Sequence, residues 1–132
     1  MATIFTKIIT GELPGRIVWS DERVAAFLTI APLTPGHTLV VPRAEVDEWT
    51  DLDPDVYAHV MTVAHTIGGA LKRVFDAPRV GLVVAGFEVP HAHVHVFPAH
   101  DMSDFDFARA DPSVPAEQLD AHHQRILAAL DR

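Results

Sequence analysis

The stretch "VPHAHVHVFP", residues 89–98, places His91, His93 and His95 at every second position, with small or apolar residues between them. Such alternation predicts a β-strand, because side chains at i, i+2 and i+4 of a strand point to one face. We expect a strand over 91–98 with the three imidazoles on one face. The opposite face, which would pack on a helix, consists of Ala92, Val94 and Val96. Val, Thr or Tyr would suit a plain strand better than three histidines, so the row needs an explanation.

The rest of the chain alternates between strand-like and helix-like patterns. Besides the histidine stretch, β-rich runs predict strands at 16–20, 23–30, 37–42 and 79–86. Apolar residues at helical spacing, with Asp53 as an N-cap before Pro54, predict helices at 4–10, 51–75 and 115–132. Connections between the first strands are short, which favours antiparallel pairing. The predicted class is α+β: a five-stranded antiparallel sheet with one long helix and one C-terminal helix.

Length and composition exclude several kinds of protein. A chain of 132 residues with 48% hydrophobic and 21% charged residues predicts one globular domain over 1–132. It has no cysteine, so disulfides and thiolate metal sites are excluded. The net charge of −8 argues against a nucleic-acid polymer as partner, because phosphate backbones need clustered Lys or Arg. No apolar run suits a membrane span or a signal peptide, so we expect a cytoplasmic protein that does not engage membranes.

Three interpretations of the histidine row stay open from the residues alone. The first is a solvated polar face without chemistry. The second is a metal site, since three histidines and a water form a catalytic zinc shell. The outer rings of a straight strand lie about 13 Å apart, so a metal would need a further ligand. The possible ligands are His37, His59, Glu88 and His100. The third is covalent catalysis, because a neutral imidazole is a good nucleophile toward phosphorus.

Two blocks of sequence carry a resemblance to a known family. "HAHVHVF" matches the pattern His-φ-His-φ-His-φ-φ, where φ is hydrophobic, and "AGFEVPHAHVHVFP" extends the match upstream. Residues 3–43, which end in "PGHTLVVPR", resemble the N-terminal half of the same family. The chain is therefore similar to the histidine triad (HIT) family of nucleotide hydrolases and transferases. The resemblance covers the core, 3–100, and leaves a C-terminal loop and helix, 101–132.

The resemblance implies a catalytic role for each of four histidines. His93 would attack the α-phosphate of a nucleoside phosphoramidate, adenylate or dinucleotide and form a nucleotidyl-histidine, which water then hydrolyses. His91 would bond to the backbone and hold the neighbouring ring in the correct tautomer. His95 would donate to a phosphate oxygen or to the leaving group, and His37 would be the fourth imidazole near the phosphate. The family resemblance implies no metal and no cofactor in this reaction, and a homodimer.

The resemblance also implies a purine nucleotide or a related phosphate ester as partner. Its base would lie in an apolar slot, for which plain core packing is the alternative, lined by Ile4, Phe5, Ile8, Phe27 and Ile30. Thr29 stands where the family has Asp or Asn to grip the ribose. Gly86 and its two successors would form the anion site. The segment 101–115 is expected to be a loop that covers the site or reaches a partner subunit.

Several positions depart from the family pattern. Phe87 and Glu88 replace the usual Gln and Ser, and the family's N-x-G segment is missing. A carboxylate beside a phosphate is repulsive unless it is protonated or turned away. Binding of a nucleotide or phosphate with little turnover is therefore an alternative function. Thr3 and Thr6 stand where many bacterial relatives have cysteines, so we expect no structural zinc there.

Overall fold

The computed structural model describes residues 2–131 and contains three helices, five strands and three short 3-10 turns. The strands are β1 (Ile17–Ser20), β2 (Val24–Leu28), β3 (Thr38–Pro42), β4 (Arg79–Val83) and β5 (Val94–Ala99). The helices are α1 (Ile4–Ile9), α2 (Pro54–Phe75) and α3 (Ala116–Leu130). The 3-10 turns span Trp49–Asp51, Met102–Phe105 and Phe107–Arg109. The predicted α+β class, with its five strands, long helix and C-terminal helix, is confirmed.

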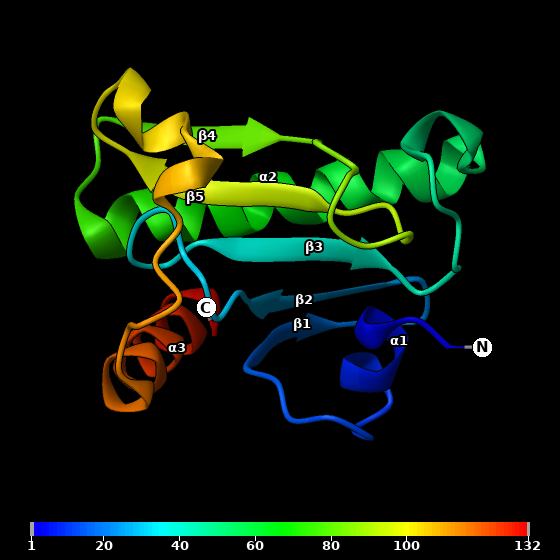
Figure 1. The fold of residues 1–132 in the computed structure, drawn as a ribbon, viewed down its shortest axis with the longest axis horizontal. Helices are drawn as coiled ribbons and strands as arrows, with labels where there is room; N and C mark the ends of the chain where they lie inside the picture. The colour runs from blue at the N-terminus through cyan, green and yellow to red at the C-terminus, as the bar shows by residue number, and fades with distance from the viewer. Residues whose placement is uncertain (1, 132) are drawn as a thin grey trace.

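The five strands form one sheet in the order β1-β2-β3-β5-β4, and every neighbouring pair is antiparallel. Figure 1 shows α2 running along one face of this sheet, with α1 beside β1 on the other side. Helix α3 packs against α2 and β1. The strand that follows the long helix, β4, lies at the edge, and β5 inserts between it and β3. This insertion brings the histidine segment beside the segment that begins at His37.

The two faces of the sheet carry separate apolar clusters. On β3, Val40 belongs to the cluster under α2, whereas Leu39 and Val41 pack with Phe5 of α1. On β5, the cluster under α2 contains Val94 and Val96, as the alternation predicts. Odd-numbered residues of β5 therefore face away from the long helix. The buried His95, paired with Leu39 across the ladder, lies on that face.

The strand predicted over 91–98 is wrong at its start, because β5 begins at Val94. The ladder between β3 and β5 runs to Val40 opposite Val94, and its continuation would place Ala92 opposite Pro42. Proline has no N–H, so Pro42 cannot donate a hydrogen bond to a strand at this position. Instead, the Ala92 N–H donates to the Val46 carbonyl at 2.7 Å. His91 and His93 therefore lie on the extended segment that leads into the strand.

Other boundaries move by a few residues. Strand β4 ends at Val83 rather than at 86, so 84–93 forms a long connection. Helix α2 begins at Pro54, and the predicted N-cap is confirmed, since the Asp53 side chain accepts from the Asp55 N–H. Within residues 2–131, no helix is both long and apolar enough to cross a membrane. A single domain over 1–132 stays a prediction.

Candidate active site

The His93 ring is held by a single backbone contact. Its Nδ1 lies 2.8 Å from the carbonyl oxygen of His91, and only a protonated nitrogen can donate to a carbonyl. The proton of a neutral His93 ring is therefore on Nδ1, and Nε2 carries a free lone pair. The ring is 2% exposed and also contacts Phe5, with ring centroids 4.9 Å apart. An imidazole fixed in this tautomer presents a nucleophile at Nε2.

His37 and His95 form a chain of hydrogen bonds with a fixed direction. The Leu33 N–H donates to Nδ1 of His37 at 2.9 Å, so the proton of that ring is on Nε2. His37 Nε2 then donates to Nδ1 of His95 at 3.0 Å. His95 must consequently carry its own proton on Nε2. The chain presents one N–H donor, His95 Nε2–H, beside the His93 lone pair, at 4.9 Å between ring centroids.

Burial keeps these rings neutral. Desolvation is the main cause that lowers the pKa of His37 to about 3, and the neighbouring His95 and His93 rings add to it. Desolvation and the His93 ring likewise lower the pKa of His95 to about 4, against the raising effect of Glu88. The pKa of His91 is also lowered, again mainly by burial. At neutral pH, His37 and His95 act as hydrogen-bonding groups rather than as cations.

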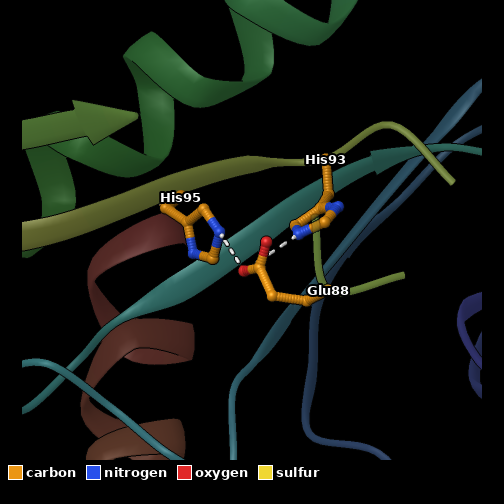
Figure 2. Close-up of side chains that lie close together, drawn as sticks. All are labelled: Glu88, His93 and His95. Carbon is orange, nitrogen blue, oxygen red and sulfur yellow. Dashed lines mark hydrogen bonds and ion pairs between the residues drawn. The ribbon is translucent and has the colours of Figure 1, made fainter. Parts of the chain in front are cut away.

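The side chain of Glu88 faces the two site histidines, as Figure 2 shows. Its Oε2 lies 3.1 Å from Nε2 of His95 and 3.6 Å from Nε2 of His93. The Glu88 side chain is 44% exposed. Partial burial acts to raise the pKa of Glu88, but the facing His95, a backbone hydrogen bond of Glu88 itself and the facing His93 outweigh burial, so the pKa is lowered. An ionised carboxylate therefore accepts the His95 N–H where the resemblance places a phosphate oxygen.

Glu88, His93 and His95 could together hold a metal, because their ligand atoms lie within 4.8 Å of one another. The hydrogen-bond chain opposes this use. Coordination through His95 Nε2 requires that nitrogen to lose its proton, whereas Nδ1 already accepts from His37. A neutral His95 would then need His37 to break its bond with the Leu33 N–H. The donor set matches a metal in distance but not in proton arrangement.

The His91 ring lies apart from this group. It is fully buried; its Nε2 donates to the Pro42 carbonyl at 2.7 Å, and its Nδ1 contacts the Thr3 hydroxyl at 2.7 Å. Thr3 also caps α1 by accepting from the Thr6 N–H. The ring thus ties α1 to β3, and the His91 carbonyl, rather than its imidazole, contacts His93.

Two adjoining pockets contain most of the predicted site residues. A pocket of about 500 Å³ opens at the histidines, and its predicted lining residues are Phe5, Thr29, His37, Phe87, Glu88, His93 and His95. A pocket of about 770 Å³ continues under α1, and its predicted lining residues are Ile4, Phe5, Ile8, Phe27, Thr29 and Ile30. The two share four residues, Phe5, Thr29, Leu39 and Val89. Both are of the size that takes small ligands.

Two predicted site residues line neither pocket, namely His91 and Gly86. Gly86 has a φ of 85°, which favours glycine, and it turns the chain ahead of Glu88. Phe87 lines the first pocket but is 96% exposed. The Thr29 hydroxyl accepts from the Ala31 N–H at 3.1 Å, and it lies where the two pockets meet. Gly86 thus acts on the site through the path of the loop.

Sequence reasoning missed Leu39 and Phe107 as pocket residues. Leu39 follows His37 at i+2 on one strand, so alternation could have placed both on one face. Phe107 packs edge-on against His95, with ring centroids 4.7 Å apart. It comes from the segment 101–115, which carries two 3-10 turns. The local sequence offered no signal for Phe107, although a covering role for this segment was expected.

Other histidines weighed as metal ligands lie elsewhere. His59 Nε2 lies 2.6 Å from the carboxylate of Asp21, which also accepts from Trp19. His100 lies near Asp104, at 3.7 Å. Neither belongs to the group around His93.

Fold and site define a class: an α+β protein whose buried histidines open onto a pocket that continues into an apolar slot. A family model described as the HIT domain matches residues 10–102. An uncharacterized HIT-like protein of Borreliella burgdorferi is 39% identical over 115 residues, 82% of this chain and 83% of the relative. The chain belongs to the HIT family, as the sequence predicts.

Two further relatives bear on fold and function. A hypothetical histidine triad nucleotide-binding protein from Sulfolobus tokodaii has a TM-score of 0.85 at 27% identity, covering 96% of this chain and 91% of the other. An asymmetrical bis(5'-nucleosyl)-tetraphosphatase of Schizosaccharomyces pombe is 31% identical, over 81% of this chain and 61% of the relative. The family therefore includes a hydrolase of dinucleoside polyphosphates.

Proposed function

We propose that the protein is a hydrolase or transferase of small nucleotides that attacks the α-phosphate through Nε2 of His93. The observation that carries this proposal is the single proton arrangement of the site. His93 Nδ1 is fixed on the His91 carbonyl, so its Nε2 lone pair faces the pocket, and His95 Nε2–H points to the same place. A nucleophile and a donor for the developing phosphoryl charge are the two parts that this reaction needs.

The proposed reaction has two steps. In the first, the His93 Nε2 lone pair forms an N–P bond, and the bond from phosphorus to the leaving group breaks with its electron pair. An amine leaves from its N-protonated form, after taking a proton from solvent, and a carboxylate leaves as an anion. In the second step, water attacks phosphorus, the N–P electrons return to His93, and a proton passes to solvent.

His95 serves this reaction as a hydrogen-bond donor rather than as an acid. Loss of its Nε2 proton would leave a negative ring, because Nδ1 already accepts from His37. Neutral donors in a buried site stabilise charge on a phosphoryl oxygen. The base and ribose of a purine nucleotide are proposed to occupy the second pocket, between α1 and β2, with Thr29 near the ribose.

The proposal is tested with adenosine monophosphate joined by a P–N bond to a simple amine. The native protein should release adenosine monophosphate, and brief mixing followed by denaturation should trap a nucleotidyl adduct on His93, detected by peptide mass spectrometry. His93→Ala should abolish both, whereas His65→Ala, at an exposed position of α2, should retain both. Unchanged turnover in His93→Ala would reject the mechanism.

Nucleotide binding with little turnover is the second candidate, and Glu88 is the observation that favours it. The carboxylate already takes the donor that a phosphate would need. Calorimetry with adenosine and guanosine monophosphates would then report binding, while the assay above shows no product. We also propose that the protein is a cytoplasmic homodimer. Light scattering of the purified protein tests whether it is a dimer.

A further inference from the structure

Glu88 is the only charged side chain among the described residues that line the pocket at the histidines. The other polar groups there are the three imidazoles His37, His93 and His95 and the Thr29 hydroxyl. No lysine or arginine in residues 2–131 lines this pocket, and the pKa values of His37 and His95 leave both rings neutral at pH 7. With His93 neutral, as the proposed nucleophile must be, the charge of the site is therefore negative before any substrate enters.

A substrate phosphate must take the His95 N–H from Glu88. The Glu88 carboxylate oxygen lies 3.1 Å from Nε2 of His95. The Glu88 side chain is half-exposed and belongs to the loop that follows Gly86. Gly86 has open space where a Cβ would stand, so this turn does not pin the loop against neighbouring atoms. Because Glu88 belongs to the pocket wall, the displaced carboxylate stays beside the reacting phosphate and its leaving group.

We propose that Glu88 is a specificity-determining residue that selects substrates by the charge of the leaving group. The inference rests on the function proposed above. A leaving group that carries an ammonium is attracted to the carboxylate, and one that carries further phosphates or a carboxylate is repelled. The second pocket contains an arginine that could offset the negative charge of Glu88. This residue, Arg16, already pairs with Asp120 at 2.9 Å. The preferred substrates are nucleotidyl phosphoramidates of cationic amines, and dinucleoside polyphosphates are disfavoured.

Three matched substrates test this selection. Each joins adenosine monophosphate through the same P–N bond to a three-carbon chain, which ends in an ammonium (trimethylenediamine), a methyl (n-butylamine) or a carboxylate (γ-aminobutyrate). The reacting bond and the nucleoside are constant, and only the terminal charge changes. We expect the native protein to show a kcat/KM for the ammonium substrate that exceeds the carboxylate substrate by roughly tenfold or more. The methyl substrate should lie between them.

Glu88→Gln should bring the ammonium-to-carboxylate ratio close to one, mainly by accelerating the carboxylate substrate. Glu22→Gln removes one exposed negative charge between β1 and β2 and should keep the native ratio. Added salt should reduce the native ratio, because it screens a half-exposed carboxylate. A native ratio that survives Glu88→Gln, or that does not respond to salt, would overturn the inference.

The outcome separates this inference from the proposed function. If His93→Ala abolishes turnover of all three substrates while Glu88→Gln leaves the ratio intact, His93 chemistry stands and the role of Glu88 is rejected. If the native protein turns over none of the three, the proposed function itself fails. Melting temperatures of both glutamate variants establish that they fold.

Discussion

Nε2 of His37 lies 3.0 Å from Nδ1 of His95, and this contact links the proton positions of the two rings. His37 comes from the turn before β3 and His95 from β5, so the contact exists because these strands are neighbours. Since the Leu33 N–H occupies the other nitrogen of His37, only one neutral arrangement satisfies both rings. The donor offered to the pocket, His95 Nε2–H, is thereby fixed by the Leu33 N–H, to which His95 is linked through two hydrogen bonds.

His37→Phe should release the tautomer of His95. Without a donor from His37, Nδ1 of His95 is left without its partner in a buried place, and both neutral tautomers become accessible. Long-range ¹⁵N NMR of the imidazoles should report a protonated Nε2 on His95 in the native protein and a mixture in the variant. We expect turnover to fall by roughly tenfold, less than the roughly 10²- to 10³-fold for outright loss of a donor, because one of the two tautomers keeps the His95 Nε2–H. His37→Gln, whose amide can donate, should restore part of the native His95 tautomer and part of the turnover. An unchanged NMR spectrum in His37→Phe would contradict the hydrogen-bond chain from Leu33 to His95.

The free energy of unfolding should fall as the pH drops below 6.5. Unfolded histidines bind a proton near pH 6.5, whereas folded His37 and His95 have pKa values of about 3 and about 4. Between these values the unfolded state binds more protons, so stability falls with decreasing pH, by about 1.4 kcal/mol per pH unit and per histidine. Above pH 6.5 neither state binds these protons, and this contribution is flat.

Urea unfolding at several pH values between about 7.5 and 4.5 measures this slope. His37→Gln removes one of the histidines with a lowered pKa and should make the slope shallower by about one histidine's share. His65→Gln removes an exposed histidine of α2 and should leave the slope unchanged. Identical slopes in the native protein and His37→Gln would contradict the burial account.

Gly36→Ala should destabilise the turn that carries His37. The φ of Gly36 is 95°, and an added Cβ would meet the Phe75 ring at 2.4 Å. Gly11 has a similar φ of 84° with nothing within 4 Å, so Gly11→Ala incurs the backbone cost alone. We expect losses of about 1–2 kcal/mol for Gly11→Ala and about 2–4 kcal/mol for Gly36→Ala. Chemical denaturation measures the loss of unfolding free energy in each variant. Equal losses would mean that the Phe75 ring moves aside without an energetic cost.

Metal removal should leave turnover unchanged. The distances among Glu88, His93 and His95 suit an ion, but coordination would break the bond between the Leu33 N–H and His37. Dialysis against a chelator should therefore keep the activity on phosphoramidate substrates, and added Zn²⁺ should not raise it. A stoichiometric ion that survives dialysis and is lost in His95→Ala, together with loss of activity on chelation, would favour the metal-dependent alternative.

Local pattern predicted the fold class, the helices and most strands, and the failures have local causes. The strand over 91–98 was extended too far because alternation alone does not reveal what lies opposite. Pro42, which cannot pair with Ala92, ends the ladder before the first two histidines. The strand predicted over 79–86 ends at Val83, because Val83 pairs with His95 and no later residue of this strand pairs with β5. Both errors depend on neighbours that are distant in sequence.

The sequence named many of the residues that the structure brings together at the two pockets, but not their proton arrangement. The resemblance named His37 and Glu88, and the structure places both beside His95. The direction of the hydrogen bonds between His37 and His95 depends on the Leu33 N–H. That backbone group donates to His37, and no pattern of side chains in the sequence predicts this contact. Phe107 reaches His95 from a segment beyond the family match, which ends at residue 102. Such contacts come from packing between distant parts of the chain.

The hydroxyl of Thr3, in contact with the buried His91 ring, joins the first helix to the histidine segment through a hydrogen bond. Phe5 of the same helix touches the rings of His91 and His93. Helix α1 thus lines the second pocket and also packs against His93, the proposed nucleophile. Because the chain contains no cysteine, oxidants have no thiol to attack at this joint.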